Sequence, residues 1–83
     1  MEYLTVRFPE TRDVLVDGLV QGKTNLVLEL EAGVHDVSLG PPRNFSPLEQ
    51  KVLLQSTSPL DPSRVDFHRL PPSAIPISPG SRP

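Results

Sequence analysis

The chain consists of short runs in which apolar and polar residues alternate, separated by segments rich in glycine and proline. Alternation with a period of two places every second side chain on one face, as in a half-buried β-strand. We expect strands at 3–8, 13–16, 19–21, 25–31, 34–39, 50–55 and 64–70. A helix fits 25–31 poorly, because Leu26 and Leu30 would share a face with little else that is apolar. The sequence therefore predicts an all-β fold of about six or seven short strands.

The glycines punctuate these runs at positions typical of tight turns. Asp17-Gly18 and Ala32-Gly33 each lie between two expected strands. We expect Gly18 and Gly33 to take a positive φ, which costs glycine little. The Asp17 side chain is expected to cap its own turn, and Gly22 to let the next strand approach closely. These four residues are predicted to have a structural role.

The alternation also predicts which side chains form the core. The expected inward residues are Leu4, Val6, Phe8, Leu26, Leu28, Leu30, Val37, Leu39, Val65 and Phe67. The two histidines, His35 and His68, are expected to point outward into solvent. A core divided among so many short strands predicts a small antiparallel β-sandwich or a partly open barrel.

One segment, 48–55, is open to two interpretations. Ser46 as N-cap, Pro47 at the first helical position and Glu49 in a capping box would fit a two-turn helix. We favour a strand at 50–55, because the neighbouring segments are all strands. The preceding loop, 40–47, is rich in proline and excludes regular structure, and its Phe45 is expected to fold back onto the core.

Proline is concentrated at the C-terminal end of the chain. Five of the 11 prolines lie in 71–83, a segment with no large apolar cluster. Such a segment buries too little surface to offset the entropy of ordering it. We therefore expect a β domain at 1–70 and a disordered, proline-rich tail or linker at 71–83. Pro76 and Pro79 have the spacing of a PxxP ligand, but the nearest basic residues are out of register with it.

Charge and composition exclude several classes of protein. The formal net charge is −2, and the eight basic residues are scattered singly, so we expect no nucleic-acid binding. No run approaches the roughly 20 apolar residues needed to span a bilayer, so we expect no membrane insertion. The chain has no cysteine, which favours a reducing compartment. A cytoplasmic location is the default expectation, and an extracytoplasmic one follows if the domain belongs to a larger exported chain.

Residues with catalytic chemistry are few and dispersed. Without cysteine, the only candidate bases are His35 and His68, beside Asp36 and Asp66. A metal could bridge the two His-Asp pairs if their strands were neighbours, but we interpret both histidines as solvated surface residues. We predict no enzymatic activity, no cofactor and no metal site.

Two successive motifs resemble those of a known family. Residues 14–18 read Val-Leu-Val-Asp-Gly and are followed by Gly-Lys-Thr at 22–24 and a leucine-rich strand. Residues 30–35 read Leu-Glu-Ala-Gly-Val-His and precede another alternating strand and then Phe45. This order, over Leu4–Leu70, resembles the PEGA domain family, small β-rich modules found mainly in bacterial and archaeal proteins. The resemblance implies a non-enzymatic interaction or scaffolding module and assigns no ligand site.

Two functions therefore stand as hypotheses. The first is a protein-interaction or scaffold module whose exposed sheet edge or loop contacts a protein partner or a second copy of the chain. The second is a carbohydrate- or cell-surface-binding module, and a regulatory domain of the transthyretin-like kind is a further alternative. The candidate binding surface consists of Tyr3, His35, Phe45 and His68. Because sugar sites need exposed aromatic rings, and Phe8 and Phe67 are expected inside, we favour the protein-contact hypothesis.

Overall fold

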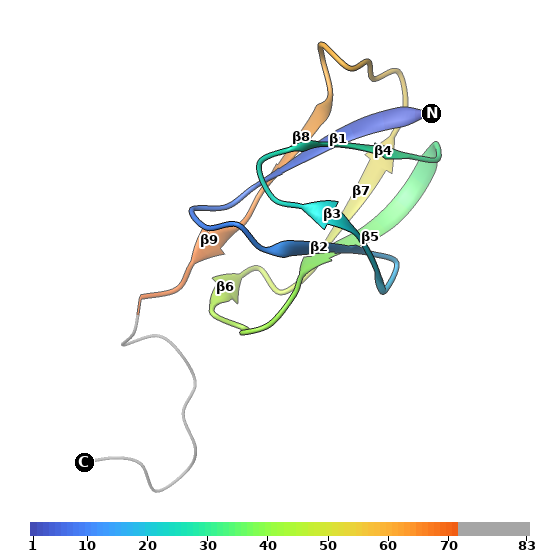
Figure 1. The fold of residues 1–83 in the computed structure, drawn as a ribbon. Coiled ribbons are helices and arrows are strands. Elements are labelled where there is room, and N and C mark those ends of the chain that lie inside the picture. The colour runs from blue at the N-terminus through green and yellow to red at the C-terminus, as the bar shows by residue number, and fades with distance from the viewer. Residues whose placement is uncertain (72–83) are drawn as a thin grey trace, which may run out of the picture.

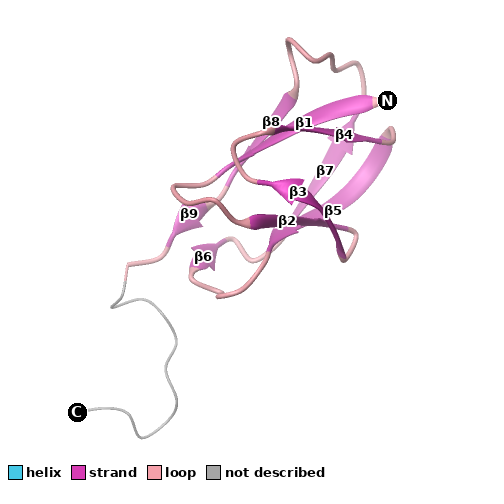
Figure 2. Ribbon diagram, viewed as in Figure 1, coloured by secondary structure: helices cyan, strands magenta, loops and turns pink. Residues whose placement is uncertain are grey.

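All regular structure in residues 1–71, the part of the chain that the computed structural model describes, is β-strand (Figures 1 and 2). The strands are β1 (Glu2–Arg7), β2 (Asp13–Val16), β3 (Leu19–Lys23), β4 (Val27–Leu30), β5 (Gly33–Leu39), β6 (Phe45–Ser46), β7 (Gln50–Leu54), β8 (Ser63–Asp66) and β9 (His68–Arg69). Seven of these nine have four or more residues, which confirms the predicted all-β fold of short strands. The predicted disordered tail at 71–83 lies, apart from Pro71, outside the described residues.

The longer strands form two sheets that share one core. One sheet has the order β4-β1-β8 and the other the order β3-β2-β5-β7, while β6 and β9 form a separate pair. All pairs are antiparallel except β1 with β8, which is parallel. The predicted antiparallel arrangement is confirmed for every other pair of the described strands. β8 reaches β1 through a loop that leaves β7 in the opposite sheet, and such a connection leaves either strand direction available.

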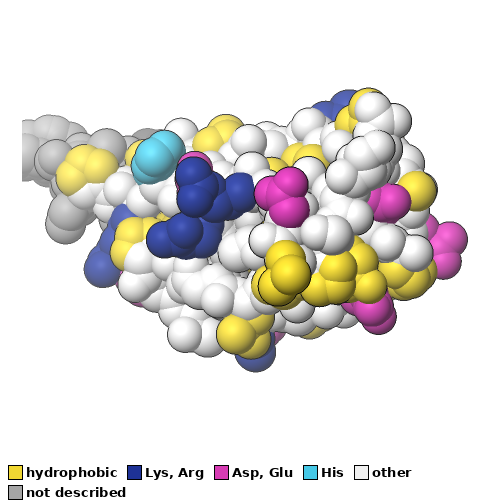
Figure 3. Space-filling model, turned by 90° about the horizontal axis from the view of Figure 1, so that it is seen from above, with side chains coloured by type: hydrophobic (Ala, Val, Ile, Leu, Met, Phe, Trp, Pro, Cys, Tyr) yellow, Lys and Arg dark blue, Asp and Glu magenta, His cyan; other side chains and the backbone are white. Residues whose placement is uncertain are grey.

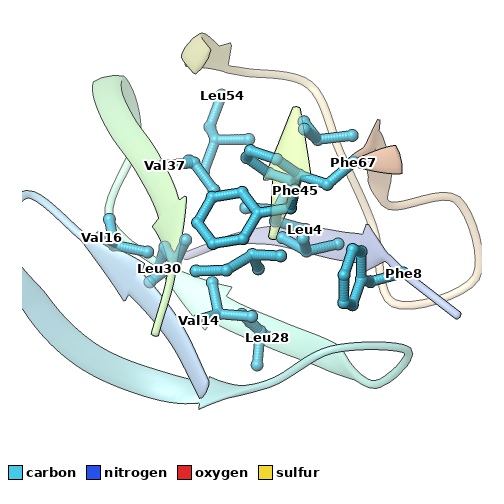
Figure 4. Packing of buried hydrophobic residues seen from close by; sticks show 13 residues of the cluster. Leu4, Phe8, Val14, Val16, Leu28, Leu30, Val37, Phe45, Leu54 and Phe67 are labelled. Atoms are coloured by element: carbon cyan, nitrogen blue, oxygen red, sulfur yellow. The ribbon is translucent and has the colours of Figure 1, made fainter. Parts of the chain in front are cut away.

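Most of the buried side chains belong to strands of the two larger sheets and meet between them, and Phe8, Phe45 and Phe67 complete this core from outside those strands (Figure 4). They are Leu4, Val6, Phe8, Val14, Val16, Leu28, Leu30, Val37, Leu39, Phe45, Leu54, Val65 and Phe67. Nine of the ten predicted inward residues are in this set. Leu26 is the exception. It is exposed, because β4 begins at Val27 and Leu26 belongs to the turn before it.

Strand pairing decides between the two interpretations of 48–55 and divides the strand expected at 64–70. Residues 50–54 form β7 and pair with β5, which confirms the strand interpretation over the helix. The single strand expected at 64–70 divides into β8 and β9, because Phe67 turns into the core between them. The residues after Phe67 then pair with β6 instead of β1.

The tight turns follow the glycines. Asp17 and Gly18 have φ angles of 52° and 86°, and two successive positive angles are the mark of a type I′ hairpin turn. Gly33 has a φ of 124°, so both predicted positive angles are confirmed. A Cβ at Gly22 would lie 2.4 Å from Cδ2 of Leu28, so a side chain of β4 occupies the space that a larger residue at this position would need.

Candidate interaction surface

Two strand edges lie side by side without pairing. β3 is the end strand of one sheet and β4 is the end strand of the other, and the two are in contact. Figure 1 shows them adjacent, joined by the turn at 24–26. We call the surface formed by β3, β4 and this turn the β3–β4 seam. Each of its strands has one edge free of partners among residues 1–71, where backbone groups can accept another strand.

The turn at 24–26 is fastened to the chain that leads from β1 to β2. Thr24 is buried, and its hydroxyl donates to the carbonyl of Glu10 at 2.7 Å and accepts from the backbone N–H of Arg12 at 2.9 Å. Asn25, with a φ of 65°, exchanges side-chain hydrogen bonds with both backbone groups of Phe8. These bonds hold the turn in place, so that the next side chain, Leu26, projects into solvent.

Exposed hydrophobic side chains gather at the seam. Nine large hydrophobic residues of the described part are exposed, and five of them lie on the seam or beside it. They are Met1, Leu19, Val20, Leu26 and Val27, with 51–66% of each residue exposed. Single exposed hydrophobic residues need no explanation, but a group on adjoining strands is typical of a contact surface.

A shallow hollow of about 250 Å³ lies beside these side chains. It is lined by Met1, Val16, Asp17, Leu19, Gln21, Glu29, Leu30, Glu31 and His35. Three of these nine are carboxylates and none is lysine or arginine. Figure 3 shows one face of the molecule, on which a patch of hydrophobic side chains lies beside acidic ones and apart from a group of basic side chains. The seam thus combines apolar surface with negative charge.

His35 is held in this hollow by two acceptors. Its Nδ1 lies 2.7 Å from the Asp17 carboxylate and its Nε2 lies 2.8 Å from the carbonyl oxygen of Glu31. Since neither partner can donate, both ring nitrogens must carry a proton for both bonds to form. The bond to Asp17, and then the bond to Glu31, raise the pKa of His35 above its usual 6.5. The backbone N–H of Asp36, and then His35, lower the pKa of Asp17.

The expectation that His35 points outward is wrong, since only 13% of its side chain is exposed. It has the same parity along β5 as the buried Val37 and Leu39, and therefore faces inward. Asp17 also differs from expectation, because its carboxylate does not cap its own turn. One oxygen accepts from the backbone N–H of Asp36 at 2.9 Å and the other contacts His35, which ties the β2–β3 turn to β5.

The four residues of the predicted binding surface do not meet in one place. Tyr3 is half-buried, and its hydroxyl donates to Glu29 at 3.2 Å, a bond that raises the pKa of the tyrosine. Phe45 is 2% exposed and belongs to the core, so it cannot present its ring to a ligand. His68 is exposed, as expected, but lines a different hollow of about 300 Å³ with Arg7, Phe8, Pro9, Asn25, Asp66 and Phe67. Tyr3, through Glu29, and His35 remain as parts of one site.

Glu29 and Glu31 of this site, and a buried arginine elsewhere, were not singled out from the sequence. The Arg12 guanidinium donates to Glu10, to Asn44 and to two backbone carbonyls of the loop at 40–42, and stacks 5.1 Å from the centre of the Phe8 ring. Its contacts are all internal, so Arg12 organises the loop. Arg12 stands alone among polar residues in the sequence, and nothing in that pattern indicates that it organises the loop.

The two histidines were also considered as ligands of one metal ion. Within residues 1–71 no three histidine, aspartate or glutamate side chains are grouped so as to hold a metal ion. His35 and His68 line separate hollows, so the bridged pair considered from the sequence does not form in the described structure.

The same part of the chain contains no helix long and apolar enough to cross a membrane.

Comparison with known protein families, curated proteins and solved structures finds no match to this chain. The resemblance to PEGA domains therefore stays a prediction.

Proposed function

We propose that this chain is a non-catalytic protein-interaction or scaffold module, and that the β3–β4 seam is its contact surface. One observation carries the proposal: five exposed hydrophobic residues gather where two unpaired strand edges adjoin. A protein partner can cover the apolar side chains and add backbone hydrogen bonds along either edge. A scaffolding role of the kind that PEGA domains have is consistent with this surface, and the absence of cysteine supports a reducing compartment such as the cytoplasm.

The sugar-binding alternative has less support. Carbohydrate sites stack sugar rings on exposed aromatic side chains. Of the four aromatic residues, Phe8, Phe45 and Phe67 are buried, and Tyr3 is half-buried with its hydroxyl engaged by Glu29. This leaves the half-buried Tyr3 as the one aromatic ring of residues 1–71 that a sugar could reach.

Selection from an unbiased peptide-display library, followed by NMR mapping on the full chain, tests the proposed function. We expect selected peptides to shift the amide signals of β3 and β4, and to lose binding on Leu19→Ser. Leu60→Ser is the matched control, because Leu60 is 98% exposed and lies outside the seam. A library without binders, or binders whose shifts lie away from β3 and β4, would contradict the proposal.

A further inference from the structure

We propose that the occupant of the β3–β4 seam is an extended segment of another protein, in which an apolar residue is flanked by lysine or arginine two positions away on each side. This inference rests on the proposed function and specifies the chemistry of the partner. It follows from the charges around the hollow, from its size and from the spacing of side chains along an extended chain.

The negative charge of the hollow is not neutralised by lysine or arginine. Asp17, Glu29 and Glu31 line it, all three residues are exposed, and none of them forms an ion pair with a lysine or arginine of residues 1–71. The two nearby lysines are engaged elsewhere, Lys23 with Asp13 and Lys51 with Asp36. His35 pairs with Asp17, and Glu29 accepts a hydrogen bond from the neutral Tyr3 hydroxyl. Cationic groups of a partner would therefore meet the negative charges of Glu29 and Glu31, with attraction that salt screens.

The same charges disfavour other occupants. In a symmetric dimer the same patch meets itself, so a second copy would bring the acidic hollows against one another. The phosphates of nucleic acids and the headgroups of anionic membranes would be repelled likewise. The exposed side chains at the rim, Met1 and Leu19, need an apolar partner to cover them, which a small cation does not supply.

The spacing of the partner follows from strand geometry. Side chains at alternate positions of an extended segment point to the same face and lie about 7 Å apart. A hollow of about 250 Å³ has room for an aliphatic side chain such as leucine or methionine. Lysine or arginine two positions before and after that residue has a long, flexible side chain, which can extend back toward Glu29 or Glu31 at the rim. The recognised pattern is basic-x-apolar-x-basic.

Synthetic peptides in one fixed frame test this inference by NMR titration of the full chain. The central sequence is Lys-Thr-Leu-Thr-Lys, compared with Ser-Thr-Leu-Thr-Ser, Glu-Thr-Leu-Thr-Glu and Lys-Thr-Ser-Thr-Lys. We expect the first to bind at least about tenfold more tightly than the other three, and to weaken severalfold between about 20 and about 200 mM salt. The double variant Glu29→Gln, Glu31→Gln is expected to remove most of the advantage of lysine over serine, while Glu49→Gln, at an exposed site outside the seam, is expected to leave it unchanged.

Several results would overturn the inference. The first is equal binding of the lysine and serine peptides, and the second is tighter binding of the glutamate peptide. The third is an unchanged affinity of the lysine peptide for the double variant, and the fourth is NMR signal shifts that lie outside β3 and β4. If the display library yields seam-binding peptides without basic residues, the interaction module stands and this inference fails. If the library yields no binders, the proposed function itself fails.

Discussion

Replacing Phe45 with leucine tests whether this ring is a structural centre of the domain. Phe45 lies in a two-residue strand, yet its ring packs edge-on against both other phenylalanines. The ring centres are 6.2 Å from Phe8 and 5.8 Å from Phe67, with interplanar angles of 84° and 86°. Leucine keeps an apolar side chain at this position and removes both aromatic contacts.

The cost of this change can be worked out from those contacts. An edge-to-face aromatic pair contributes about 0.5–1.5 kcal/mol beyond the burial of its area, so losing two costs about 1–3 kcal/mol. A domain with 71 described residues has a free energy of unfolding of about 4–11 kcal/mol, at about 0.05–0.15 kcal/mol per residue. Phe45→Leu should therefore leave a folded but weakened protein, whereas Phe45→Ala, at about 3–5 kcal/mol, should remove much of the stability.

Thermal and urea unfolding, followed by circular dichroism, provide the measurement. Each kcal/mol lost lowers Tm by about 4–8 °C in a domain of this size. Leu60→Ala is the control, since that residue is 98% exposed and should change stability by no more than about 0.5 kcal/mol. A double-mutant cycle with Phe67→Leu should give a coupling of about 0.5–1.5 kcal/mol. A loss below about 0.5 kcal/mol on Phe45→Leu, or no coupling to Phe67, would refute the reasoning.

Three other perturbations have defined outcomes. Because the pKa of His35 is raised, its contribution to stability is complete below about pH 6.5 and is lost as pH rises through the folded-state pKa. Because the pKa of Asp17 is lowered, the contribution of Asp17 to stability is lost as pH falls below about 3.8. Urea unfolding across pH and an NMR titration of the His35 ring measure this, and a ring that titrates below 6.5 would contradict it. Gly22→Ala should destabilise by about 1–3 kcal/mol, since its Cβ would overlap Leu28, and thermal unfolding unchanged from the parent would show that β4 can move aside. Arg12→Lys should lower the free energy of unfolding by about 1–3 kcal/mol, because an ammonium group cannot reproduce the forked contacts to four acceptors. Urea unfolding measures this loss, and full stability of the variant would count against a stabilising role of the Arg12 hydrogen bonds.

The interaction surface was only partly within reach of the sequence. Tyr3 and His35 were expected there, but as solvated side chains, and their partners Glu29 and Glu31 were not singled out. Three separate segments line the hollow: the start of β1, the β2–β3 hairpin, and the end of β4 with β5. A single sequence carries the polarity of each segment, but it does not show which segments become neighbours.

Local chemistry determined the strands and their turns. The period-two alternation of Leu4, Val6 and Phe8 needs one apolar face to be buried, whatever the partner strand. Asp17-Gly18 supplies a positive φ through backbone preference alone, and the same holds for Gly33. These signals depend on residues close together in the chain, so they can be recognised without knowledge of the fold.

Tertiary structure alone decided the features that depend on distant partners. The parallel direction of β8 and the exposure of Leu26 each follow from contacts between segments far apart in the sequence. The same holds for the two edge-on contacts of the Phe45 ring, although its burial was expected from the sequence. The same is true of His35, whose charge state depends on Asp17, 18 residues away. The β3–β4 seam exists because two sheets end side by side, and the free energy of packing the whole core, not the preference of either strand, places those edges together.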